Sequence, residues 1–347
     1  MIIPIFIFFF MFAGLSLLWP SDIKYSREIT NLLFISLWTV LVLIVVFRSP
    51  DMLDYHQYHL AFINDSLERA EIGYRWLQHI VRTLTNNFYV HLFIMGCLSV
   101  GLKLYAIKKL SSFYCLSILI YLSNIFILHD MIQIRAAVAS GIILISTYYI
   151  HNRKFLPFLI LLLFGALFHK SIIVLFPIWF INTRKLNIKI WLSVIPIAYI
   201  LAITNHSFGN YVALLPIESI TDHYNQYQLA MKDGYFTKIN IFNSLILLRI
   251  AVCSILTYNC NKISKKNSYI YLWVKIYIIA IACAPLLSDF PVLAGRISEL
   301  LLVIEILLLP LIVFLFNKKD YFIGKSVVIG IGLTMLLINT YYIKILL

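Results

Sequence analysis

The stretch TNLLFISLWTVLVLIVVF at residues 30–47 decides the class of fold, because it contains no charged side chain. A second stretch, ISELLLVIEILLLPLIVFLF at residues 297–316, is almost as apolar. A helix needs about 20 apolar residues to cross the hydrocarbon core of a bilayer. A helix also satisfies its own backbone hydrogen bonds there, where water cannot. The two stretches therefore predict transmembrane helices.

The composition extends this prediction to the whole chain of 347 residues, which is 62% hydrophobic and only 12% charged. A soluble domain is about half apolar and roughly a quarter charged. The first apolar run, residues 2–19, lacks a basic leading region and a small-residue cleavage site, so it is expected to be an uncleaved span. The sequence thus predicts an all-α polytopic membrane protein.

About twelve spans can be placed, and they form one transmembrane domain over residues 1–347. Their expected positions are 2–19, 30–47, 88–107, 112–128, 131–150, 155–168, 171–181, 190–204, 240–258, 269–286, 297–316 and 326–345. The two long hydrophilic segments, 48–87 and 205–239, are expected to cap an outward-facing cavity in the bundle.

The net charge of +13 follows the loops between these spans. One set of alternate loops is richer in lysine and arginine, and it includes Lys103, Lys108 and Lys109. Basic loops stay on the cytoplasmic side, which places both termini and both long segments outside. This distribution explains the charge without a nucleic-acid partner. The five cysteines show no spacing typical of zinc.

Ionisable residues gather at the outer ends of the predicted spans, where each has an energetic cost that invites a functional explanation. They lie in RSPDMLDYHQY (residues 48–58), HDMIQIR (129–135), LFHKS (167–171) and DFPVLAGRISEL (289–300). Arginine binds phosphate oxygens with two parallel hydrogen bonds. Carboxylates and tyrosines suit sugar hydroxyls, and a histidine or carboxylate can act as a general base.

Each of these residues also has a purely structural interpretation, which the sequence leaves open. Arg135 could pair with Asp130 to orient a helix end, and His169 could be an interfacial histidine. Arg48 could anchor the end of the second span. The small residues that follow Arg135, AAVASG, predict close packing between helices.

Residues 70–84 form an amphipathic segment that also allows two interpretations. Ile72, Trp76, Ile80 and Leu84 fall on one helical stripe, with Arg75 and Arg82 on other faces. The segment either lies along the membrane surface or is an ordinary loop helix packed on the bundle.

In its motifs the chain resembles the EpsG-like polysaccharide polymerases, relatives of the Wzy O-antigen polymerases. The motifs are Arg48 with Asp54-Tyr55-x-x-Tyr58, Glu71-x-Gly73-Tyr74, Gln133-Ile-Arg135-Ala-Ala-Val-Ala139, Phe168-His169-x-Ser171 and Gly295-Arg296-Ile. They occur in the family's order and cover most of the chain. Lys170, Glu299 and the glycine-free approach to Asp54-Tyr55 depart from the pattern.

The resemblance implies a membrane glycosyltransferase in O-antigen, capsule or exopolysaccharide synthesis, located in the bacterial inner membrane with its active site on the outer face. Donor and acceptor would be oligosaccharide repeat units linked to undecaprenyl diphosphate. It implies no cofactor and no metal, and it allows a chain-length regulator as a partner besides membrane lipid.

The same resemblance assigns roles to individual residues. His169 is the first choice for the general base and Asp54 the second. Arg135 and Arg296 would bind the diphosphate, with help from Arg48. The residues expected to position sugars are Tyr55, Tyr58, Glu71 and Tyr74, and Gln133 is expected to bind the substrate.

Three other functions stay open. A flippase or transporter for lipid-linked glycans would favour an internal repeat and charges throughout the bundle, neither of which the sequence shows. An O-antigen ligase or acyltransferase is a second alternative, and a non-catalytic member of an export complex is a third.

Overall fold

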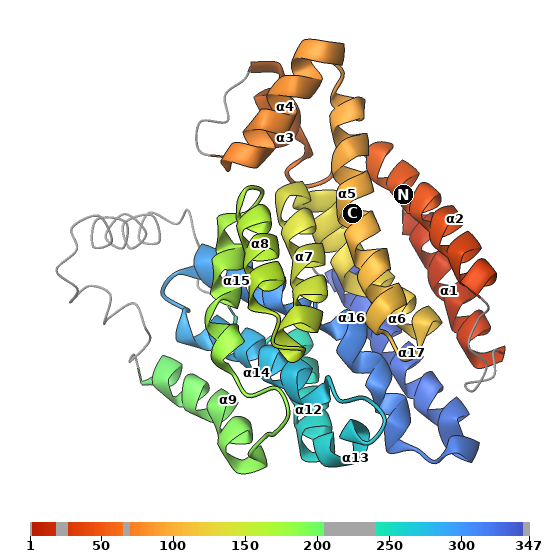
Figure 1. Cartoon of the computed structure of the whole chain (residues 1–347), viewed down its shortest axis with the longest axis vertical. Coiled ribbons are helices and arrows are strands. Elements are labelled where there is room, and N and C mark those ends of the chain that lie inside the picture. Colours follow the sequence, from red (N-terminus) through yellow and green to blue (C-terminus); the bar gives the residue numbers. More distant parts are fainter. Residues whose placement is uncertain (1, 19–26, 65–69, 205–239, 343–347) are drawn as a thin grey trace. The chain divides into compact units, whose positions relative to one another are not determined.

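The structure is a computed structural model that describes residues 2–18, 27–64, 70–204 and 240–342. Every regular element within these ranges is a helix (Figure 1), which confirms the predicted all-α fold. Segment 205–239, expected to cap the cavity, lies outside the described residues. By its internal contacts the chain divides into two compact units, and each is described by itself. Unit 1 comprises Met1–Trp179, Lys265–Asn267 and Val303–Leu347, and unit 2 comprises Phe180–Ser264 and Ser268–Leu302.

Helices coincide with the predicted spans, most of them within a few residues at the ends; the last, predicted at 326–345, already begins at Lys318. Among the residues that the structure describes, five helices are long and apolar enough to cross a membrane: Phe88–Leu110, Tyr114–Ile132, Ile134–His151, Pro291–Leu315 and Lys318–Tyr341. The remaining predicted spans coincide with shorter apolar helices, such as Phe155–Ala166 and Ile188–Ile203. The positions of the helices are therefore confirmed. The total of about twelve crossings and the outward-facing cavity stay predictions, as does the single domain.

The centre of unit 1 is built from seven of the described helices in the N-terminal half of the chain. They are α1 (Ile2–Leu18), α2 (Arg27–Val46), α5 (Phe88–Leu110), α6 (Tyr114–Ile120), η1 (Tyr121–Ile132), α7 (Ile134–His151) and α8 (Phe155–Ala166). Helix α5 packs against both α2 and α7, and α7 packs against α8. A Cβ atom on Gly141 of α7 would lie 2.7 Å from Leu102 Cβ of α5. Only glycine allows this approach, which confirms the close packing expected from AAVASG.

The C-terminal part of the chain completes unit 1. It contains α16 (Glu305–Leu308), η4 (Leu309–Leu315), η5 (Lys318–Asp320), α17 (Tyr321–Leu337) and η6 (Ile338–Tyr342). Helix α17 packs on η4, η1 and α6. After α17, the amide of Asn339 in η6 donates to Asn124 Oδ1 of η1 at 2.9 Å. The C-terminal segment is therefore held to the middle of the unit by buried polar groups as well as apolar ones.

Two short helices, α3 (Tyr55–Asn64) and α4 (Ile72–Thr85), lie together at the end of unit 1 where α5 begins (Figure 1). Helix α4 buries Tyr74, Gln78 and Val81 on one face. The opposite stripe stays exposed, with Trp76 at 69% and Leu84 at 77% of their full accessibility. Helix α4 packs on α5 through its buried face, as expected for a loop helix packed on the bundle. The membrane-surface interpretation stays a prediction.

Unit 2 is built around α14 (Ile270–Leu286). The helices that pack on it are α9 (Ile188–Ile203), α12 (Ser244–Tyr258), α13 (Cys260–Ser264) and α15 (Pro291–Leu302). Lys275 of α14 is buried and donates to the backbone carbonyls of Asn182 and Lys185. These carbonyls help to compensate the buried cation.

Candidate functional site

The site is assembled where the start of α4 meets the turn after α8. The backbone N–H groups of Gly73 and Tyr74 donate to the carbonyl of Leu167, at 2.9 and 3.2 Å. A Cβ atom on Gly73 would lie 2.6 Å from Leu167 Cβ and 2.9 Å from Leu167 O. No other side chain fits this contact. Gly73 therefore fixes Glu71, which precedes α4, beside His169, which precedes the short helix η2 (Lys170–Leu175).

Glu71 is the centre of this arrangement, because its carboxylate contacts two other segments. One oxygen, Oε2, lies 2.8 Å from Nη1 of Arg135 at the start of α7. The other, Oε1, accepts from the backbone N–H of Lys170 at 3.2 Å and lies 3.7 Å from Nδ1 of His169. Glu71 and His169 are 7% and 8% exposed. A charge-assisted network of this kind is held firmly in a buried setting.

Two tyrosines form the wall beside Arg135. Its guanidinium lies 6.0 Å from the ring centre of Tyr58 and 5.9 Å from that of Tyr74. The hydroxyl of Tyr74 is 3.0 Å from Nε2 of His91 in α5. Burial raises the pKa of both phenols, and the cations of Arg135 and Arg48 oppose that rise in each. Both hydroxyls therefore stay protonated and able to donate hydrogen bonds at neutral pH.

Arg48 follows α2 and lies almost wholly inside the unit, at 3% exposure. Its Nη1 donates to the carbonyl of Met131 at 2.8 Å, and its guanidinium lies 5.5 Å from the ring centre of Tyr55. Burial lowers the pKa of Arg48 to about 10, so it still carries its charge at neutral pH. Nε and Nη2 have no hydrogen-bond partner among the described residues. Arg48 thus supplies positive potential and unused donors.

Asp54, directly before α3, has a strained backbone conformation. Its φ of 63° lies in the left-handed region, which a non-glycine residue adopts at an energetic cost and usually for a reason. Its carbonyl accepts from the backbone N–H of Tyr58 at 3.0 Å. Its carboxylate acts electrostatically on Arg48 and Tyr58. The turn therefore brings Asp54, Tyr55 and Tyr58 to the same side as Arg48.

The structure brings together eight of the ten predicted site residues. They are Arg48, Asp54, Tyr55, Tyr58, Glu71, Tyr74, Arg135 and His169, all in unit 1. Gln133 lies two residues before Arg135, at the junction of η1 and α7, with a partly exposed side chain. Arg296 is an exposed residue of α15 in unit 2, so its role stays a prediction. Among the described residues, no group of histidine, cysteine, aspartate or glutamate is arranged to hold a metal ion.

One polar network was assigned incorrectly from the sequence. Lys103 lies inside α5 and not in a cytoplasmic loop, and its Nζ is 2.9 Å from Asp130 Oδ1 and 2.7 Å from the carbonyl of Ala137. Tyr121 donates to the other Asp130 oxygen at 2.8 Å. The side chains of Lys103 and Asp130 are fully buried. The suggested pairing of Arg135 with Asp130 is therefore wrong, because Asp130 pairs with Lys103 and Arg135 with Glu71.

The apolar run FYVHL at residues 88–92 gave no indication that His91 would contact Tyr74 of the site. The sequence did contain a signal for Lys103. An isolated lysine in an apolar helix needs a buried partner that compensates its charge. His129 is also buried, and neither of its ring nitrogens has a hydrogen-bond partner among the described residues.

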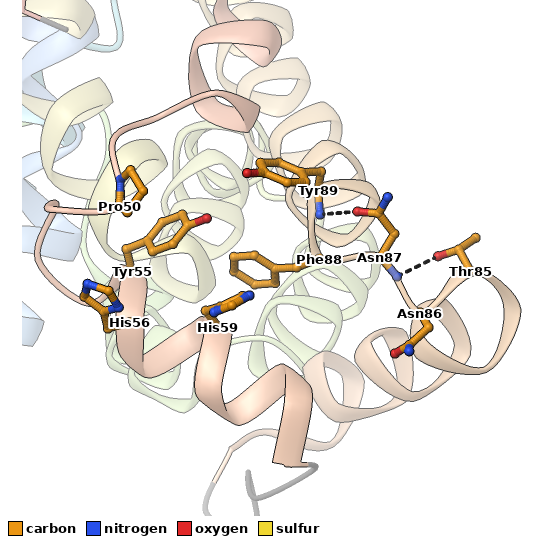
Figure 2. Close-up of a pocket in the computed structure, with 9 residues that line it drawn as sticks. All are labelled: Pro50, Tyr55, His56, His59, Thr85, Asn86, Asn87, Phe88 and Tyr89. Atoms are coloured by element: carbon orange, nitrogen blue, oxygen red, sulfur yellow. Dashed lines mark hydrogen bonds between the residues drawn. The ribbon is translucent and has the colours of Figure 1, made fainter.

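A pocket of about 520 Å³ lies beside this cluster, between the start of α3 and the α4–α5 junction. Figure 2 shows the rings of Tyr55, His59, Phe88 and Tyr89 around the hollow. Asn87 accepts from the backbone N–H of Tyr89 at 2.9 Å and so begins α5. Tyr55 belongs both to this pocket and to the contact with Arg48. Tyr55 therefore connects the pocket to the cluster around Arg48.

Comparison with known proteins places these features in a family context. The model of the EpsG family matches residues 31–346, which include all the predicted site residues. The amylovoran biosynthesis protein AmsC of Erwinia amylovora is 24% identical over 319 residues, which are 86% of this chain and 83% of that protein. No solved structure shows a significant match.

Proposed function

This chain belongs to the EpsG family, and from that membership we propose that it polymerises lipid-linked oligosaccharide repeat units. The reaction would transfer a growing glycan from undecaprenyl diphosphate to a second lipid-linked unit on the outer face of the inner membrane. The name of AmsC assigns that relative to the biosynthesis of amylovoran, which fits a role in making a polysaccharide. Transmembrane helices and a cluster of charged residues at one end of unit 1 suit substrates that stay in the membrane.

The observation that carries the proposal is the grouping of Glu71, Arg135 and His169. A glycosyl transfer from a diphosphate needs a cation at the leaving group and a base at the acceptor hydroxyl. Arg135 is the cation, with 25% of its side chain exposed, and its Nε has no hydrogen-bond partner among the described residues. His169 is the base, 3.7 Å from a carboxylate that favours its protonated form once it has taken the proton.

The bond changes follow directly. The acceptor sugar hydroxyl attacks the anomeric carbon of the donor, and its proton passes to His169. The bond from that carbon to the diphosphate oxygen breaks, and undecaprenyl diphosphate leaves with the electron pair. Attack from the opposite face inverts the anomeric configuration. Asp54 is the alternative base, because it lies on the same side of the cluster as Arg48 and Tyr58.

The remaining residues of the cluster position the substrates in this proposal. Arg48 is too deeply buried to bind phosphate without movement, so it acts through its positive potential and by holding Tyr55. Tyr58 and Tyr74 are also buried, so their protonated hydroxyls would donate to sugar oxygens only after the site opens. Gln133 and Arg296 would contact the substrate as the resemblance implies, and a chain-length regulator would act from outside the site.

The proposal is tested by deleting the gene and analysing surface polysaccharide on a gel. A polymerase mutant keeps a single repeat unit and loses the ladder of longer chains, and Arg135→Ala should reproduce this pattern. Arg135→Lys should fail to restore the ladder, because lysine keeps the charge but not the two-pronged geometry. Loss of every surface glycan would instead indicate a flippase. A normal ladder in the lysine variant would show that Arg135 is only a helix-end charge.

A further inference from the structure

We infer that the pocket beside Tyr55 is a binding subsite for uncharged sugar residues of the glycan, separate from the cluster that takes the diphosphate. The inference rests on the proposed function, and it adds residues that the sequence did not suggest: His59, Asn86 and Tyr89. These residues belong to α3 and to the α4–α5 junction, so they come from segments different from those that carry Arg135 and His169.

The chemistry of the lining selects the ligand. Its nine residues include no lysine, arginine, aspartate or glutamate, so the pocket carries no permanent charge and suits a neutral ligand better than a phosphate group. Aromatic rings line one side of the hollow, and the amide and hydroxyl groups of Asn86, Asn87 and Thr85 lie on the other (Figure 2). Sugars present an apolar face of C–H groups and an edge of hydroxyls, and such a lining matches both. A purely hydrocarbon ligand would leave the polar groups unpaired.

The rings form a connected wall. Tyr55 and His59 are stacked with their ring centres 6.0 Å apart and their planes 26° from parallel, and His59 lies 5.1 Å from Phe88. Tyr89 is 50% exposed and offers its ring to the opening. Binding sites for small molecules occupy about 300–1,000 Å³, so the volume of about 520 Å³ suits a short end of a glycan.

The polar groups are positioned by the α4–α5 junction. Asn86 adopts the left-handed region with φ of 48°, which turns the chain sharply between the two helices. Asn87 uses its oxygen to begin α5, and its amide N–H₂ group remains available as a donor. The pocket is therefore a consequence of how α4 ends and α5 begins.

The link to the reaction is Tyr55. The guanidinium of Arg48 lies 5.5 Å from its ring centre, while the same ring lines the pocket. A glycan in the pocket would therefore reach the charged cluster by way of this ring. This arrangement separates recognition of the sugar from stabilisation of the leaving group.

The experiment measures sugar binding without the lipid or the diphosphate. The probe is surface polysaccharide of the wild-type strain, cut by mild acid to short oligosaccharides and presented to the full-length protein in nanodiscs. Saturation-transfer NMR should detect binding to the wild-type protein and to Arg135→Ala. Tyr89→Ala and His59→Ala should each weaken the binding about five- to tenfold. Tyr89→Phe keeps the ring and should retain most of it.

Phe93→Ala is the matched control, because Phe93 is an exposed aromatic residue of α5 one turn beyond Tyr89 and outside the pocket. It should bind as the wild type does. Wild-type binding by both Tyr89→Ala and His59→Ala would overturn the inference. In a polymerisation assay the pocket variants should raise KM and retain kcat, whereas Arg135→Ala should lose kcat. Failure of the proposed function would appear as a normal ladder in Arg135→Ala, so the two failures are distinguishable.

Discussion

The buried pair Lys103–Asp130 allows the most quantitative prediction for the fold. Asp130→Asn removes the negative charge but keeps the size of the side chain, so Lys103 remains as an uncompensated cation with one backbone carbonyl. Both side chains are fully buried, and their atoms are 2.9 Å apart. Removing one partner of a buried pair costs about 3–5 kcal/mol. At about 2–4 °C per kcal/mol, the melting temperature should fall by roughly 10 °C.

The assay is thermal unfolding of the purified protein in detergent, followed by size-exclusion chromatography with fluorescence detection. The double variant Lys103→Met/Asp130→Leu is the control, because replacing a buried ion pair by apolar side chains is often neutral or stabilising. It should melt well above Asp130→Asn, although Tyr121 loses its acceptor. The reasoning would be refuted by a wild-type melting temperature for Asp130→Asn, or by a double variant less stable than either single one.

Three further outcomes test the site and its orientation. Gly73→Ala should force α4 away from Leu167 and abolish chain extension, whereas Gly330→Ala, where a Cβ atom meets nothing within 4 Å, should leave the ladder unchanged on a gel. His169→Gln should keep a hydrogen bond but lose proton transfer, which is worth about a hundred- to ten-thousand-fold in rate; substantial polymer in this variant would move the base to another residue. Alkaline phosphatase fused after residue 60 should be active and after residue 155 inactive, and the reverse pattern would contradict an outward-facing site.

The helices were predictable because each apolar run carries its own requirement for a helix in lipid. The run at residues 88–107, for example, corresponds to α5 at Phe88–Leu110. The site residues were also recognisable as types, since arginines, carboxylates and tyrosines at the ends of helices suggest binding. The contacts that these residues make with one another could not be predicted. Glu71 and Arg135 are 64 residues apart in the chain, and no local pattern specifies which cation a given carboxylate will meet.

The error over Lys103 has a related cause. Counting basic residues by loop treats every lysine near the end of an apolar run as exposed, although a lysine in a helix can be neutralised by a neighbour. The pocket was missed for another reason. It depends on the angle at which α4 meets α5, and that angle is set by the backbone of Asn86 and the contact of Gly73 with Leu167. Neither signal can be read from composition or hydropathy.

The position of Lys103 has a consequence for how the chain enters the membrane during synthesis. Helix α5 emerges first and carries a cation that costs about 2.5–3.5 kcal/mol near the centre of a bilayer. The carboxylate that neutralises it arrives 27 residues later, on the next helix, after a connection of only residues 111–113. We therefore expect α5 and the following helix to insert together as a hairpin. The order in which the chain leaves the ribosome would then determine when its core becomes stable in lipid.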